Sequence, residues 1–66
     1  MTHEIIGLNA GKIWETLNEN GKLTSSKLAK MTELKKDEVM LAIGWLFKED
    51  KIGTDSTTRT VKFFLK

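Results

Sequence analysis

The stretch LTSSKLAKMTELKKDEVMLAIGWLFKEDKIGTDSTTRTVKFFL, from Leu23 to Leu65, changes its apolar period once, after Lys51. Before that residue, apolar side chains recur every three or four positions, which is typical of one face of a helix, and after it they alternate as in a strand. The later part predicts two antiparallel strands, Ile52 to Thr54 and Thr60 to Leu65, joined by the polar loop of residues 55–59. The stretch therefore predicts an α+β fold in which helices precede a hairpin.

Two helices are expected before the period changes. Hydroxyl side chains at residues 24–26 can cap the first of them, because each can accept a bond from a free backbone N–H. This short helix is predicted from about Ser26 to Met31, and Thr32 to Lys35 forms the turn that follows it. The second helix is predicted from about Lys36 to Lys48 or Asp50, with carboxylates in its first turn, where the helix dipole favours them.

A further helix precedes this pair. Apolar residues at helical spacing follow from Ile6 and predict a helix that ends near Asn18, and Asn20 and Gly21 supply residues that tolerate a positive φ at its end. Leu23 is expected to add one or two rungs of a short strand. Phe64 is expected to alternate outward from the last strand. The side chains expected in or beside the core are Ile6, Ala10, Ile13, Leu17, Leu28, Met31, Leu34, Val39, Met40, Ala42, Ile43, Leu46, Phe47, Val61, Phe63 and Leu65.

The chain has 66 residues with no cysteine and no proline, so we expect one domain over residues 1–66. A chain of this size buries only about 60% of the surface that it exposes when unfolded, which makes self-association plausible. Its start lacks the features of a signal peptide, and we expect the protein in the cytoplasm. The longest apolar run is far shorter than the ~20 residues that span a bilayer, which excludes membrane insertion.

Enzymatic chemistry has little support in these residues. The only histidine is His3 near the start, and there is no cysteine to act as nucleophile or metal ligand. The glycines match no phosphate-binding loop. We therefore expect no catalytic residues, no metal, no cofactor and no small-molecule ligand.

Three segments carry a resemblance to a known family: GKIWETL, GKLTSSKLAKMTELKKDEVMLAIGWLFKEDKI and TRTVKFFLK. Together they resemble a family of small prokaryotic winged helix-turn-helix proteins of unknown function. The most distinctive part is AIGWLFKEDKI, from Ala42 to Ile52. The resemblance implies a three-helix bundle with a C-terminal β-hairpin wing and, by wider analogy, a regulator of transcription.

Double-stranded DNA is the first partner to consider for such a domain. In helix-turn-helix proteins the second helix of the motif enters the major groove, and nearby cations neutralise phosphates. Thr57 or Thr58 could bond a phosphate from the loop. The alternative is that the cations only solubilise the protein, since the net charge of +2 permits DNA binding without arguing for it. The candidate DNA-binding residues are Lys27, Lys30, Lys35, Lys36, Arg59 and Lys62.

The second helix of the pair is poorly suited to reading bases. Its outward face carries Asp37, Leu41, Gly44 and Lys48, whereas direct readout typically uses several Arg, Lys, Asn or Gln side chains. A glycine in mid-helix costs about 1 kcal/mol relative to alanine, and close approach of another backbone is a usual reason for it. That partner is either the first helix, where Gly7 and Gly11 lie four apart, or a second subunit. A homodimeric interaction module is therefore the alternative function, with a candidate interface of Leu41, Gly44, Trp45, Phe64 and Trp14.

Overall fold

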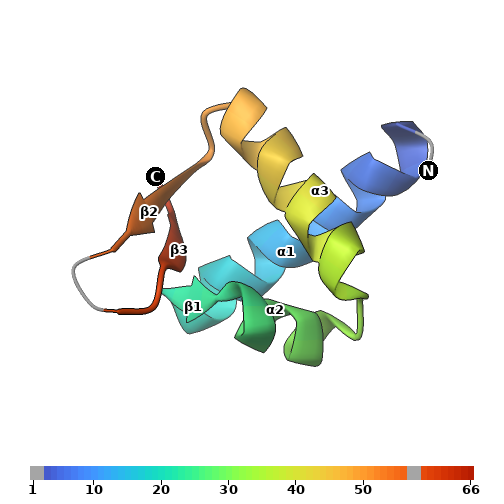
Figure 1. Cartoon of the computed structure of the whole chain (residues 1–66). Coiled ribbons are helices and arrows are strands. Elements are labelled where there is room, and N and C mark those ends of the chain that lie inside the picture. Colours follow the sequence, from blue (N-terminus) through green and yellow to red (C-terminus); the bar gives the residue numbers. More distant parts are fainter. Residues whose placement is uncertain (1–2, 57–58) are drawn as a thin grey trace.

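The computed structural model describes residues 3–56 and 59–66, which form three helices and a small sheet (Figure 1). The two helices at the centre of Figure 1 are the first and third, which pack against each other, and the second lies below them. The predicted α+β winged helix-turn-helix architecture is confirmed. In chain order the elements are α1 (His3–Asn20), β1 (Leu23–Thr24), α2 (Ser25–Thr32), α3 (Lys36–Lys48), β2 (Ile52–Asp55) and β3 (Lys62–Leu65).

The first helix, α1, ends two residues later than the sequence predicted. The side-chain amide of Asn20 donates to the backbone oxygen of Thr16 at 2.8 Å, which adds a bond at the end of the helix. Gly21 then adopts a φ of 79°, and its N–H donates to Leu17 O at 2.8 Å. The predicted role of Gly21 as the terminating residue is confirmed, because few other residues adopt a positive φ without strain.

Side chains and backbone together set the bounds of α2 and α3. The Thr24 hydroxyl accepts the Lys27 N–H at 3.1 Å, so α2 begins at Ser25, one residue earlier than predicted. Glu33, with a φ of 61°, ends α2 in the left-handed conformation. At the start of α3, Glu38 Oε1 accepts the Lys35 N–H at 2.9 Å. These caps fix the turn between the two helices.

The sheet has the strand order β1-β3-β2, with both pairs antiparallel. The short strand expected at Leu23 is confirmed, since Leu23 pairs with Phe63. The prediction that the last strand begins at Thr60 is wrong, because β3 begins at Lys62, where the last partners on β1 and β2 are reached. Val61 lies outside the strand and is 44% exposed, so its predicted place in the core is also wrong.

The core lies where α1, α2 and α3 meet the inner face of the sheet. Met31 was expected there and is 42% exposed instead. Leu28 is the residue of α2 that belongs to the buried core, and Leu34 in the following turn packs against that core. Met40 and Phe47, expected on one flank of the core, are also exposed. The buried apolar residues are Ala10, Ile13, Leu17, Leu28, Val39, Ala42, Ile43, Leu46, Ile52 and Phe63.

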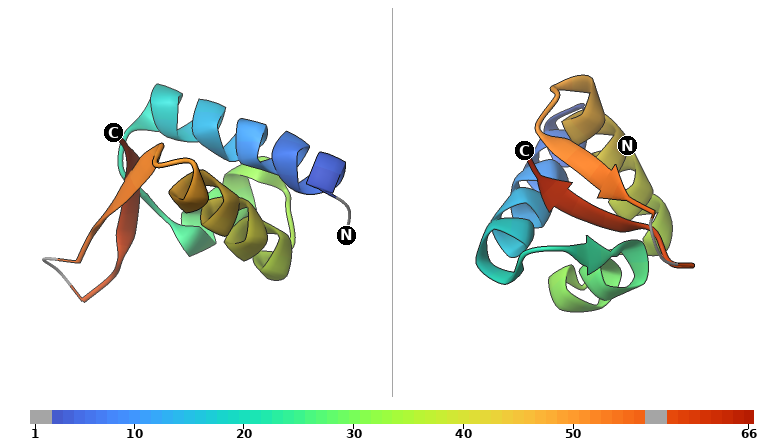
Figure 2. Two further views of the ribbon diagram at one scale, coloured as in Figure 1. Left: turned by 90° about the horizontal axis from the view of Figure 1, so that it is seen from above. Right: turned by 90° about the vertical axis from the view of Figure 1, so that its left-hand side faces the viewer.

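Figure 2 shows two parts of the fold that other elements do not cover, one side of α3 and the β2–β3 hairpin. In its left-hand view α1 lies along one side of α3, and the opposite side of α3 has no helix or strand over it in the part of the chain drawn in colour. The β2–β3 hairpin projects beyond the helices in the same view. In the described residues, no helix is long and apolar enough to cross a membrane.

Candidate nucleic-acid interface

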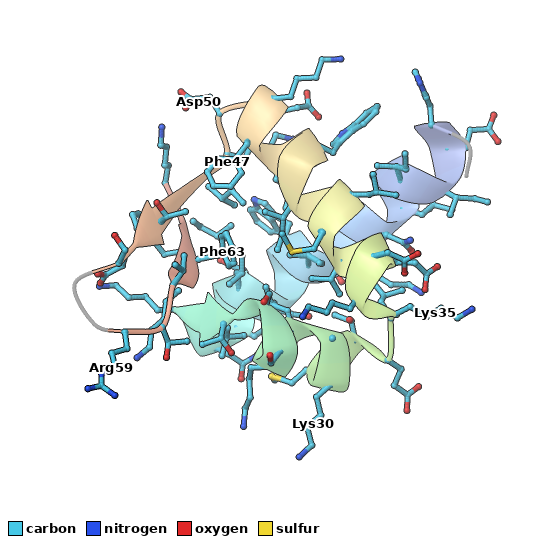
Figure 3. All side chains as sticks on the ribbon, viewed as in Figure 1. Lys30, Lys35, Phe47, Asp50, Arg59 and Phe63 are labelled. Atoms are coloured by element: carbon cyan, nitrogen blue, oxygen red, sulfur yellow. The ribbon has the colours of Figure 1, made fainter. Side chains whose placement is uncertain are left out.

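The candidate cations of the helical part all lie at the surface. Lys27 and Lys30 are exposed on α2, Lys35 is the residue before α3, and Lys36 is the first residue of α3. Figure 3 shows the Lys30 side chain projecting from α2 and the Lys35 side chain projecting from the turn. The caps described above hold the backbone under these side chains, so the motif presents four ammonium groups from a fixed frame.

The hairpin adds two further candidates. Arg59 is exposed beside the start of β3, and its guanidinium points away from the protein in Figure 3. Lys62 is exposed on β3, with Asp55 as its partner across the β2–β3 ladder. The candidate Thr57 and Thr58 lie outside the described residues.

Asp55 distinguishes the two hairpin cations electrostatically. Its Oδ2 accepts a hydrogen bond from Lys22 Nζ at 2.7 Å. Asp55 is also the residue opposite Lys62 in the β2–β3 ladder. Side chains of residues directly opposite each other in a ladder are neighbours, so this carboxylate lowers the positive potential around Lys62. Lys62 is therefore the weaker candidate for phosphate. The contact joins Lys22, between α1 and β1, to Asp55 at the end of β2, and the sequence contains no local signal for it.

The candidate cations other than Lys62 are not neutralised by an ion pair among the described residues. Within residues 3–56 and 59–66 the ion pairs are Lys22 with Asp55 and Lys66 with Asp50, and neither uses any of the six candidates. Surface ammonium and guanidinium groups that are not paired within the protein are able to neutralise phosphates. No group of three or more metal-ligating side chains is found among the described residues.

The outward face of α3 is apolar at its centre. Leu41 is 47% exposed and Met40 is 48% exposed, and these two line a shallow hollow together with Lys36 and Asp37. Gly44 is exposed one turn further along, and a Cβ at this position would have nothing within 4 Å apart from its own helix and chain neighbours. The prediction that this helix is poor in base-reading groups is consistent with that surface.

The structure brings together only some of the candidate interface residues. Trp14 and Trp45 line one groove of about 260 Å³ between α1 and α3. The indole N–H of Trp45 donates to Glu49 Oε1 at 2.9 Å, and Lys48 Nζ lies 5.5 Å from the ring centroid. Phe64 lies apart from this groove, on the sheet.

Packing of Gly44 against the glycines of the first helix is not observed. A Cβ at Gly7 or Gly11 would also have no outside atom within 4 Å, so none of the three glycines lies at a close helix contact within the described protein. Of the two partners considered for Gly44, the first helix is therefore not the one that approaches it within the described residues. The α1–α3 contact is made instead by larger side chains, among them Ala10, Ile13 and Leu46.

Comparison with known proteins agrees with this geometry. The model of a family described as a winged helix-turn-helix domain (DUF2582) matches residues 1–65. The solution NMR structure of protein BT2368 from Bacteroides thetaiotaomicron is 32% identical, with a TM-score of 0.89, and the match covers 98% of this chain and 79% of that one. No curated protein matches the chain.

A second solved structure has the same fold at lower identity. It is the crystal structure of the Zα domain of PKZ from Carassius auratus in complex with Z-DNA. This domain is 23% identical, with a TM-score of 0.82, and the match covers 92% of this chain and 97% of that one. At this identity the likeness shows the fold alone.

Proposed function

Because this chain belongs to the winged helix-turn-helix domain family DUF2582, we propose that it binds double-stranded DNA through the cations of α2, the turn before α3 and the hairpin. The observation that carries the proposal is that these cations are exposed and take no part in the ion pairs of the described residues. The Zα domain, which has the same fold, was crystallised in complex with Z-DNA, and this supports a nucleic acid as the ligand.

Phosphate contacts dominate this binding mode. The helix that would enter the groove presents Met40, Leu41 and Gly44 at its centre, and none of these side chains donates or accepts a hydrogen bond to a base edge. Affinity then comes from Lys and Arg on phosphates, and each such contact contributes about −0.9 to the slope of log K against log salt. Five or six contacts give a slope of about −5 and a weak dependence on base sequence.

We propose a non-enzymatic role in the regulation of transcription, in the cytoplasm, as the biological setting of this activity. In helix-turn-helix repressors and activators the second helix of the motif lies in the major groove of a duplex. The family match supports the setting through the fold, and the cations of the motif support it through their charge.

The test compares two charge reversals of equal size on opposite parts of the fold. Lys30→Glu changes an exposed cation on α2, and Lys12→Glu changes an exposed cation on α1, away from the motif. Binding to a fluorescent mixed-sequence duplex is followed by anisotropy from low to physiological salt. We expect Lys30→Glu to weaken binding several-fold and to flatten the salt slope, while Lys12→Glu binds like the wild type. Equal affinities of the two variants, or no binding by the wild type at low salt, would contradict the proposal.

A further inference from the structure

The α1–α3 groove, of about 260 Å³, combines aromatic and charged side chains. Trp14 of α1 and Trp45 of α3 both line it, and α1 lies along α3 in the left-hand view of Figure 2. No small-molecule ligand was expected from the sequence, because the two tryptophans belong to different helices and only packing brings them to one groove. The groove is a cavity that the DNA-binding proposal does not use.

Small residues keep the groove open on the side of α1. Gly7, Ala10 and Gly11 recur at the spacing of one helix face, and all three line the groove. A Cβ at Gly7 or Gly11 would meet no outside atom within 4 Å, so no close helix contact among the described residues requires a glycine there. Glycine is the least favourable residue inside a helix after proline. The two glycines are accounted for if a ligand uses the space that a side chain would fill.

The charged side chains of the groove favour a cation as that ligand. Glu15 and Glu49 contribute two carboxylates and Lys51 contributes one ammonium, which gives the lining a net charge of −1 in a chain whose net charge is +2. None of these three side chains takes part in the ion pairs of the described residues. The carboxylates would repel an anion such as a nucleotide, whereas they attract a cation.

Trp45 already interacts with a cation of its own chain. Lys48 Nζ lies 5.5 Å from the centroid of the Trp45 ring, within the distance at which an aromatic face attracts a cation. The indole N–H donates to Glu49 Oε1 at 2.9 Å, which holds a carboxylate beside the ring. A carboxylate has about four acceptor sites, so Glu49 can accept further hydrogen bonds. This arrangement suits a flat cation that stacks on a ring and donates hydrogen bonds.

We propose that the α1–α3 groove binds a small alkylguanidinium ligand. A guanidinium group is planar, stacks on aromatic faces and donates hydrogen bonds to carboxylates, whereas an ammonium is a compact and strongly hydrated charge. The tryptophans offer the faces, and Glu15 and Glu49 offer the acceptors. The alkyl chain occupies the open space beside Gly7 and Gly11. The groove is smaller than the ~300 Å³ at which pockets for drug-sized ligands begin, so the ligand is about as large as one side chain.

This binding is independent of DNA binding and is weak. The lining of the groove does not include Lys30 or Arg59, which lie on α2 and beside the hairpin strand β3. We expect a dissociation constant in the millimolar range, because the ligand is small and contacts between exposed charges contribute little in water.

The test is an NMR titration of the full chain. The chain has two tryptophans, so its two indole N–H signals report on the groove from both helices. The probe is butylguanidinium, and the control ligand is butylurea, which has a similar shape and no charge. We expect butylguanidinium to shift both indole signals until they saturate, and butylurea to leave them in place.

Two conservative substitutions test the carboxylates. Glu15→Gln and Glu49→Gln each remove one charge and keep the size of the side chain, and a glutamine at residue 49 can still accept the indole N–H. We expect the dissociation constant for butylguanidinium to rise about threefold in each variant. The matched control is Glu19→Gln, at an exposed site of α1 outside the lining of the groove, which should bind like the wild type.

A pair of glycine variants separates binding from folding. Gly11→Gln and Gly44→Gln each place a better helix former at an exposed glycine, so we expect both melting temperatures to rise. Of these two glycines only Gly11 lines the groove. We therefore expect Gly11→Gln to weaken the binding of butylguanidinium several-fold and Gly44→Gln to leave it unchanged.

Several results would overturn the proposal. One is the lack of a saturable shift of the indole signals at tens of millimolar butylguanidinium, and another is an equal shift with butylurea. Wild-type affinity in both glutamine variants of the carboxylates, or in Gly11→Gln, would also contradict it. A short capped peptide with one arginine that binds more tightly than butylguanidinium would identify a partner protein, and not a small molecule, as the occupant.

Discussion

The ring of Phe64 lies against the backbone of Gly53, and a Cβ at residue 53 would lie 2.7 Å from Phe64 Cζ. These two residues are partners across the β2–β3 ladder. Lys22 Nζ lies 5.8 Å from the centroid of the same ring. An aromatic side chain that covers the glycine opposite it helps to fix the register of the two strands. This contact explains why Phe64, expected to point outward, is only partly exposed.

Gly53→Ala is expected to destabilise the protein, because the new methyl group occupies the place of the Phe64 ring. Gly53 has no positive φ, so the effect is steric and does not come from the backbone. Crowding of this kind costs about 1–3 kcal/mol of unfolding free energy. Urea denaturation followed by circular dichroism measures the change, and a midpoint equal to that of the wild type would show that the ring can move aside at no cost.

Gly11→Ala is expected to have the opposite effect. Gly11 is exposed within α1, and a Cβ there would have no outside atom within 4 Å. Replacing a glycine inside a helix with alanine stabilises it by up to about 1 kcal/mol. The same urea titration should show a higher midpoint for this variant. A lower midpoint would mean that a methyl group at residue 11 disturbs the packing around the groove between α1 and α3.

The sequence predicts the elements whose signals are local. The spacing of Ala10, Ile13 and Leu17 predicts α1, and the change of period after Lys51 predicts the hairpin, because each pattern lies within one element. The start of β3 was predicted two residues early because the lengths of its partners β1 and β2, and not its own residues, decide where pairing begins. Pairing across strands cannot be read from alternation alone.

In the candidate site, too, the sequence predicts what depends on single residues and misses what depends on contacts between distant segments. That the six cations lie at the surface could be predicted, since Lys and Arg are almost never buried without a partner. That Lys62 faces Asp55, or that Trp14 shares a groove with Trp45, depends on the register and the packing of distant segments. Position and charge therefore identify the candidates, and only the structure ranks them.

The proximity of Asp55 leads to a ranking of two DNA-binding variants. Lys30→Ala removes an exposed ammonium with no ion pair among the described residues, whereas Lys62→Ala removes one that lies beside a carboxylate. We expect Lys30→Ala to reduce the affinity for a duplex more and to flatten the salt slope by about one unit. Lys62→Ala should have a smaller effect on both, because Asp55 already offsets part of its charge. Anisotropy titrations at several salt concentrations measure both quantities, and a larger effect of Lys62→Ala would reverse the ranking.

Asn9 is a polar residue in the core, and its replacement by an apolar residue is expected to stabilise the fold. It is 6% exposed, and its Nδ2 has no hydrogen-bond partner among residues 3–56 and 59–66. A buried donor without an acceptor costs about 1–3 kcal/mol. Asn9→Leu has a similar shape and no donor, so its melting temperature should rise, whereas the control Asn18→Leu, at an exposed site of α1, should change little. Because leucine cannot replace a hydrogen bond, a lower melting temperature for Asn9→Leu would mean that the amide is paired in solution.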